Sequence, residues 1–115
     1  MTATYTDKKT GLTLETVNTA ALREGDILRN NGCLMKLGPL KEQPNDQGHP
    51  ERGLTRWARG YIMPQNGTGT IPRPWLDHDE HGNAYWIVQG NDHATWSRFT
   101  DPDAVQIDTE AEAGR

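Results

Sequence analysis

The strongest structural signal in the sequence is a tight turn between two apolar runs. Asn31-Gly32 separates residues 26–30 from residues 33–37. A two-residue hairpin turn needs positive φ at its central positions, which glycine adopts freely and asparagine adopts better than most residues. The pattern therefore predicts an antiparallel hairpin. We expect its second strand to end at Gly38-Pro39, because proline cannot donate a hydrogen bond to a neighbouring strand.

The rest of the chain repeats this organisation of short strands and turns. Alternating or strongly β-forming residues predict strands within 12–17, 54–63, 84–89 and 94–99, with a short last strand within 101–107 as an option. The proline-rich segment 71–76 is expected to be an extended edge, and residues 18–26 have room for one helical turn. Glycine and proline make up 12 and 7 of the 115 residues, and no strand-helix alternation is visible. We therefore expect an all-β fold.

Five to six short strands favour a small antiparallel barrel or a strongly bent sheet. The run Leu22-Arg-Glu-Gly-Asp-Ile-Leu resembles the opening of Src-homology-3 barrels, where a Gly-Asp turn leads into the first hairpin. The prediction is a Src-homology-3-like barrel forming one domain over residues 11–108. Residues 1–10 are predicted to be flexible, residues 109–115 to be a disordered acidic tail, and Lys41 to Gly53 to be a long surface loop.

The apolar content limits the size of the core. Only 33% of the residues are hydrophobic and the mean hydropathy is -0.86, so we expect a thin core to which the four tryptophans contribute. Cys33 is the only cysteine, and its apolar surroundings predict a buried, inert thiol. No apolar run reaches the roughly 18 residues of a membrane span, and the first residues do not read as a secretory signal. We expect a cytoplasmic protein that does not enter a membrane.

No residue pattern points clearly to catalysis or to a metal. Residues 77–81, Asp-His-Asp-Glu-His, include metal-ligating side chains, but they precede Gly-Asn and a strand, which is typical of a solvated turn. A metal-dependent enzyme centred on His78 and His81 is the weaker alternative. No nucleophile elbow or phosphate-binding glycine loop is present, although four residues could contribute to a triad: Cys33, His49, His93 and Ser97. We expect no catalytic residues, no metal and no cofactor.

Arginines interleaved with aromatic residues form the most substantial candidate site. Residues 29–75 carry seven positive and three negative side chains, whereas residues 76–115 carry two positive and nine negative ones. The predicted binding residues are Arg52, Arg56, Trp57, Arg59, Tyr61, Arg73 and Trp75. Trp and Arg are enriched in protein-protein hot spots, and the same residues can bind single-stranded nucleic acid. The alternative to a binding role is that the tryptophans only fill the core. The net charge of -4 disfavours a strong nonspecific nucleic-acid binder.

Three short runs resemble small proteins encoded by tailed phages of actinobacteria. They are the Trp-x-Val-Gln-Gly-Asn…Trp run from Trp86 to Trp96, Gly-Asp-x-Leu at 25–28, and Ile-Pro-x-x-Trp at 71–75. The resemblance implies an accessory protein that acts in a bacterial host, through host takeover or counter-defence, and it transfers no catalytic residue. The sequence-level hypothesis is a non-enzymatic protein that binds a host protein, as a monomer or a homodimer. A small barrel that binds single-stranded nucleic acid through its Arg and Trp residues is the alternative.

Overall fold

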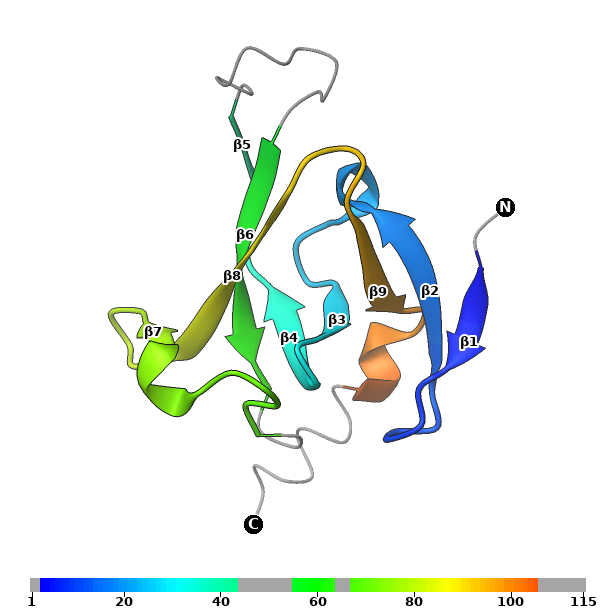
Figure 1. The fold of residues 1–115 in the computed structure, drawn as a ribbon, viewed down its shortest axis with the longest axis horizontal. Coiled ribbons are helices and arrows are strands. Elements are labelled where there is room, and N and C mark those ends of the chain that lie inside the picture. The colour runs from blue at the N-terminus through cyan, green and yellow to red at the C-terminus, as the bar shows by residue number, and fades with distance from the viewer. Residues whose placement is uncertain (1–2, 44–54, 64–66, 106–115) are drawn as a thin grey trace.

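The computed structural model describes residues 3–43, 55–63 and 67–105, and these form one curved antiparallel sheet (Figure 1). Within those ranges the sheet has nine strands. They are β1 (Thr4–Thr6), β2 (Thr13–Asn18), β3 (Ile27–Asn30), β4 (Cys33–Leu37), β5 (Lys41–Gln43), β6 (Thr55–Ile62), β7 (Asp77–His78), β8 (Ala84–Gly90) and β9 (Thr95–Phe99). Two 3-10 helices, η1 (Thr19–Ala21) and η4 (Arg73–Trp75), and a helical turn over residues 102–105 complete the described structure.

The predicted hairpin is confirmed and lies at the centre of the fold. Asn31 and Gly32 have φ of 53° and 77°, as a two-residue turn with positive φ requires. Strands β3 and β4 are buried on both faces, since Leu28 pairs with Met35 on one face while Ile27 and Leu34 face the other way. An antiparallel hairpin covered on both sides explains why its apolar residues are consecutive and do not alternate with polar ones.

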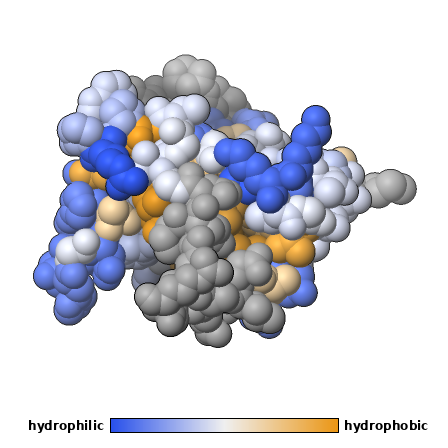
Figure 2. Space-filling model, turned by 90° about the horizontal axis from the view of Figure 1, so that it is seen from below, coloured by the Kyte–Doolittle hydropathy of each residue, from blue (hydrophilic) through white to orange (hydrophobic). Residues whose placement is uncertain are grey.

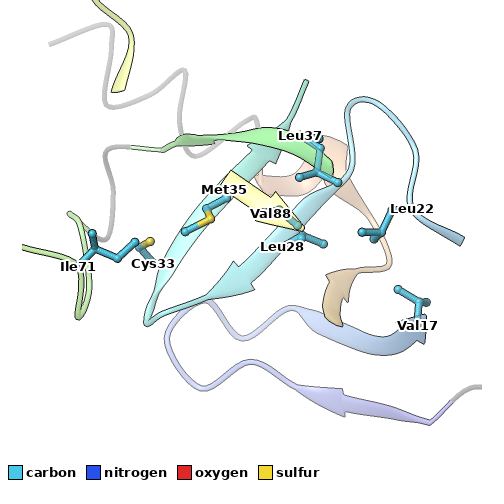
Figure 3. Close-up of a cluster of buried hydrophobic side chains, with 9 residues drawn as sticks. Val17, Leu22, Leu28, Cys33, Met35, Leu37, Ile71 and Val88 are labelled. Carbon is cyan, nitrogen blue, oxygen red and sulfur yellow. The ribbon is translucent and has the colours of Figure 1, made fainter. Parts of the chain in front are cut away.

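Two apolar clusters cover the two faces of this hairpin. The larger lies inside the bend of the sheet and contains Val17, Leu22, Leu28, Cys33, Met35, Leu37, Ala58, Ile71 and Val88. Figure 3 shows Met35 beside Val88 and Cys33 beside Ile71. The smaller cluster contains Leu14, Ile27, Leu34, Met63, Phe99 and Val105. Seen from below, apolar residues lie between hydrophilic flanks (Figure 2). The Cys33 thiol is fully buried as predicted, and burial raises its pKa.

The strands follow the order β1-β2-β9-β3-β4-β6-β8-β7, with β5 added beside β6. The mainly antiparallel β fold is therefore confirmed, and the six strands expected from the sequence are present as β2, β3, β4, β6, β8 and β9. The sheet is open, because its end strands β1 and β7 do not pair, and three further short strands raise the count above the predicted five to six. A closed barrel is thus not what the described residues form.

The two tryptophans Trp86 and Trp96 do not lie on neighbouring strands. They lie on β8 and β9, which are separated in the sheet by β3, β4 and β6. The chain bends at Gly90, where a Cβ atom would lie 2.8 Å from Ala94 Cβ and 3.2 Å from the Trp96 ring. Trp96 packs against the larger cluster instead, and its indole N–H donates to Thr19 Oγ1 at 2.9 Å. Both rings contribute to the core.

Four segments differ from the sequence-based prediction. Residues 1–10 were expected to be flexible, yet β1 pairs with β2 and the buried carboxylate of Asp7 binds Arg29. The predicted loop from Lys41 begins with β5, which pairs with β6. Proline at two positions within 71–76 favours the 3-10 helix η4 over an extended edge. Within 101–107, residues 102–105 are helical because Asp101 Oδ1 accepts the Ala104 N–H and Val105 enters the core.

The remaining predictions about the chain's ends and loops concern residues outside the described ranges. The acidic tail 109–115 and most of the loop 41–53 fall there. Among the described residues, no helix combines the length and the apolar character that crossing a membrane requires.

Candidate functional site

Strand β6 has two faces of opposite character. Ala58 and Gly60 are buried inside the bend, whereas Trp57, Arg59 and Tyr61 project from the other face. Gly60 lies where no side chain would fit, since a Cβ there would be 2.9 Å from Met35 Sδ and 3.1 Å from Val88 Cγ2. The inner residues thus anchor β6 to the core, and this anchoring fixes where the outer side chains point.

Neighbouring strands extend the outer row of β6 into a surface. In the antiparallel register Trp57 lies opposite Gln89, Arg59 opposite Ile87, and Tyr61 opposite Tyr85. On the other side of β6, Lys36 of β4 lies opposite Tyr61 and Lys41 of β5 lies opposite Trp57. Directly opposed residues share a face of a sheet. We call this surface the outer face: Lys36, Lys41, Trp57, Arg59, Tyr61, Tyr85, Ile87 and Gln89.

Arg59 is held at the centre of the outer face by aromatic rings. Its guanidinium carbon lies 4.6 Å from the centroid of the Tyr85 ring, a cation-π distance. The Tyr61 and Tyr85 rings meet edge to face, with centroids 5.8 Å apart and planes at 64°. Arg59 Nη1 also donates to the Tyr61 hydroxyl at 3.4 Å, and this hydrogen bond is the main reason that the pKa of Arg59 is raised. The Arg59 side chain is therefore charged and already held in place before any ligand binds.

Positive charge dominates the part of the outer face around Arg59 and Trp57. Within the described residues, neither Arg59 nor the two lysines of the face takes part in an ion pair. Among the described residues, carboxylates border the face at the end where Asp77 of β7 lies opposite Tyr85 and Asp79 follows. In a chain whose net charge is -4, the outer face is therefore a positive region that ends at an acidic margin.

Two hollows lie on either side of Tyr61 and Pro39, which line both. The smaller hollow, about 260 Å³, is bounded by Pro39, Lys41, Trp57, Arg59 and Tyr61. The larger hollow, about 530 Å³, combines apolar and polar lining residues: Glu24, Lys36, Leu37, Gly38, Pro39, Tyr61, Ile62, Asp79, Asn83 and Ala84. Gly38 makes room for the ring that separates them, because a Cβ there would lie 3.2 Å from Tyr61 Cε2.

The structure brings together three of the seven predicted binding residues. Trp57, Arg59 and Tyr61 share the outer face. Arg73 and Trp75 lie on η4, where the Trp75 side chain is 67% exposed, and they belong to a different element from β6 and β8. Arg52 lies outside the described residues.

Arg56 lies on the opposite face of β6 and is bound by two carboxylates. It forms ion pairs with Asp92 and, at 3.3 Å, with Glu42, its direct partner on β5. Burial lowers the pKa of Arg56, but the hydrogen bonds that Arg56 donates to these two carboxylates outweigh burial and raise the pKa overall. This arginine joins β5 and the turn after β8 to β6, and its charge is already neutralised.

Several residues of the outer face were missed at the sequence level: Lys36, Lys41, Tyr85, Ile87 and Gln89. The alternation of Tyr85, Ile87 and Gln89 was visible within their strand. What the sequence lacked was the register that places Tyr85 beside Tyr61. Lys41 was assigned to a loop, so its position opposite Trp57 could not be inferred.

The segment 77–81, the weaker alternative, consists of the short strand β7 followed by the turn that the sequence predicted. Asp79 Oδ1 accepts the backbone N–H groups of His81 and Asn83, both at 2.9 Å. The hydrogen bond from the Asn83 backbone is the largest contribution to the lowered pKa of Asp79. In the described ranges, no three His, Cys, Asp or Glu side chains are grouped as metal ligands. Ser97, one of the residues considered for a triad, hydrogen-bonds the Tyr5 hydroxyl.

The fold and site define a small, mainly antiparallel β protein with an aromatic and cationic face. Comparisons of the chain with protein-family models, curated proteins and solved structures found no match.

Proposed function

We propose that this chain is a non-enzymatic interaction protein, encoded by a phage, that binds a host protein through the outer face and serves host takeover or counter-defence. One observation carries the binding proposal: Arg59 is charged and fixed on the Tyr85 ring, yet has no ion-pair partner among the described residues. The phage origin is supported only by the resemblance of the three short runs from 25 to 96.

The composition and rigidity of the outer face support a protein partner. Tryptophan, tyrosine and arginine are the residues most enriched in binding hot spots, because they bury much surface around a directed polar group. Trp57 and Tyr61 are half-buried, so their rings are already fixed before binding. The stack of Arg59 on Tyr85 likewise reduces the entropy lost when a partner binds. Ile87 adds an exposed apolar contact in the same row as Arg59.

We propose in addition that the path β9-β3-β4-β6-β8 is an opened Src-homology-3-like arrangement. Two features support this: β3, β4, β6 and β8 pair in chain order, and β9 returns to lie beside β3. The chain passes from β8 to β9 through only the short segment 91–94. Such an arrangement leaves the outer surface of the meander accessible to a ligand.

Single-stranded nucleic acid is the second candidate, because three aromatic rings and three cations share one sheet face. Two features rank it below a protein. Arg59 covers one side of the Tyr85 ring, which leaves less ring surface for stacking a base. Asp77 and Asp79 border the same end of the face, and phosphates would be repelled there.

The proposal is tested by affinity capture from a lysate of an actinobacterial host. Wild type is compared with Arg59→Glu and with two matched controls on η4, Arg73→Glu and Trp75→Ala. We expect one stoichiometric host protein to be retained by wild type and by both controls, and lost with Arg59→Glu. If all four proteins retain it equally, or if no stoichiometric protein is recovered in repeated captures, the proposed binding face is wrong.

Nucleic-acid binding is tested separately through tryptophan fluorescence. The protein is titrated with oligothymidylate and oligouridylate at low and then at physiological salt. A saturable quench that weakens steeply with salt and disappears in Arg59→Glu would place nucleic acid first, because phosphate contacts release counterions. We expect no saturable quench at either salt concentration.

A further inference from the structure

We infer that the outer face binds an extended peptide segment with an acidic side chain in the smaller hollow and an apolar side chain in the larger one. The inference rests on the proposed function and specifies its partner. It follows from the different chemistry of two adjacent hollows that share Tyr61 and Pro39 as a common wall.

The smaller hollow has the chemistry of a carboxylate site. Of the described residues that line it, two are cations, Lys41 and Arg59, and none is acidic. Arg59 lies over the Tyr85 ring, and a guanidinium stacked in this way keeps N–H groups at its edge for a carboxylate. Trp57 and Tyr61 form apolar walls, which lower the local dielectric and strengthen a charge-assisted hydrogen bond.

The larger hollow favours an uncharged, apolar side chain. Pro39, Tyr61 and Ile62 contribute apolar surface, and the hollow is roomier than its neighbour. Its charged lining residues, Lys36 against Glu24 and Asp79, carry a net negative charge. A second acidic side chain would be repelled there, whereas an aliphatic or aromatic one would gain burial. Phosphates along a nucleic-acid strand would meet the same repulsion.

An extended segment matches the arrangement of the hollows. Trp57, Arg59 and Tyr61 occupy every second position of β6 and share one face. The two hollows that they line therefore lie next to each other along the strand. Side chains on one side of an extended peptide recur about every 6.5–7 Å, which allows two of them to straddle the Tyr61 ring. The matching motif has Asp or Glu two positions from a large apolar residue.

The first experiment is a selection from a random peptide library displayed on filamentous phage, with immobilised wild-type protein as bait. We expect peptides in which Asp or Glu stands two positions from Leu, Ile or an aromatic residue. The Kd of a selected synthetic peptide is then measured by fluorescence anisotropy. Exchanging its acidic residue for lysine, or using bait with Arg59→Glu or Lys41→Glu, should weaken binding about tenfold or more.

Two variants serve as controls for these measurements. Arg73→Glu makes the same charge change on η4 and should leave the Kd unchanged. Glu24→Lys should let the larger hollow accept an acidic side chain. A library selection with this variant as the bait should therefore enrich peptides that carry a second Asp or Glu. Circular dichroism and thermal unfolding of each variant show whether the fold is intact.

The inference is overturned if no motif is enriched, if the enriched peptides are basic, or if Arg73→Glu weakens binding as much as Arg59→Glu. The proposed function is judged by the capture experiment and not by the library. Captured host protein without an enriched peptide would indicate that the outer face binds a folded surface, in which case only the inference fails. Salt-sensitive binding of oligothymidylate in place of peptide would overturn both.

Discussion

The two faces of β6 use arginine in opposite ways. Arg56 and Arg59 are three residues apart, on opposite sides of the same strand. Arg56 is bound by Asp92 and Glu42 and ties neighbouring segments to the sheet. Arg59 has no such partner among the described residues and lies on the Tyr85 ring. The first arginine stabilises the fold, whereas the second keeps its charge available to a ligand.

Two other arginines of the described structure, Arg98 and Arg29, follow the pattern of Arg56. Arg98 connects two carboxylates, Glu15 and, at 3.1 Å, Asp26, and it also donates to the carbonyl of Ala21 at 2.9 Å. Arg29 binds Asp7 through two hydrogen bonds, of 3.0 Å and 2.6 Å. The number of arginines in a segment therefore says little about binding. What distinguishes a candidate binding arginine is an aromatic platform without a carboxylate.

The largest effect on stability is expected from Arg98→Ala, compared with Arg59→Ala. The Arg98 side chain is only 21% exposed, and its loss leaves the Glu15 and Asp26 carboxylates near each other without a cation. We expect the free energy of unfolding to fall by about 2–4 kcal/mol. Urea denaturation measures it. Arg59→Ala should leave the denaturation midpoint nearly unchanged, and equal losses in the two variants would contradict the contrast between the two kinds of arginine.

A pH-dependent effect of similar or smaller size is expected at the ion pair of Asp7 and Arg29. Burial raises the pKa of Asp7, but hydrogen bonds from Arg29 and Thr10 outweigh burial and hold it below its ordinary value. A carboxyl with a lowered folded-state pKa stabilises the protein above the unfolded-state pKa of about 3.9, and this contribution is lost as pH falls. Asp7→Asn should therefore cost about 1.5–3 kcal/mol near neutral pH.

The measurement is urea denaturation of wild type and Asp7→Asn from about pH 7 down to about pH 3. The difference between the two proteins should stay constant at first and narrow below about pH 4. The other carboxyl groups are the same in both proteins, so their contribution to the pH dependence cancels in the difference between the two free energies of unfolding. A gap that widens on acidification would mean that the pKa of Asp7 is raised and not lowered.

The inner face of β6 is expected to tolerate no added atoms. In Gly60→Ala the new Cβ would lie 2.9 Å from Met35 Sδ and 3.1 Å from the Trp86 carbonyl oxygen. We expect a loss of about 1–3 kcal/mol from overpacking. The matched control is Lys36→Ala on the outer face, which should change stability by no more than about 0.5 kcal/mol. Thermal or urea unfolding of both variants shows whether only the inner face is packed tightly enough for a substitution to lower the stability.

Local sequence signals predicted the hairpin and six of the strands, because each depends on residues close together in the chain. Asn31-Gly32 specifies its own turn, and the alternation from Trp57 to Tyr61 specifies its own face. The register that brings Tyr85 to Tyr61 depends on how distant strands share a core, which no local pattern encodes. For the same reason Arg56 was wrongly placed among the predicted binding residues. Its ion pairs with Glu42 and Asp92 depend on contacts between segments that are distant in the sequence.

The smallest expected effect is that of Tyr61→Phe, which distinguishes between the two contacts that hold Arg59. Tyr61→Phe removes only the hydroxyl that accepts a hydrogen bond from Arg59 at 3.4 Å, and keeps the ring contact with Tyr85. We expect a stability change within about 0.5 kcal/mol and an unchanged peptide Kd. Tyr85→Leu removes the platform itself and should weaken peptide binding. Double-mutant cycles should then show coupling of Arg59 to Tyr85 and none to the Tyr61 hydroxyl. The reverse result would mean that a hydrogen bond, and not the aromatic ring, positions the arginine of the outer face.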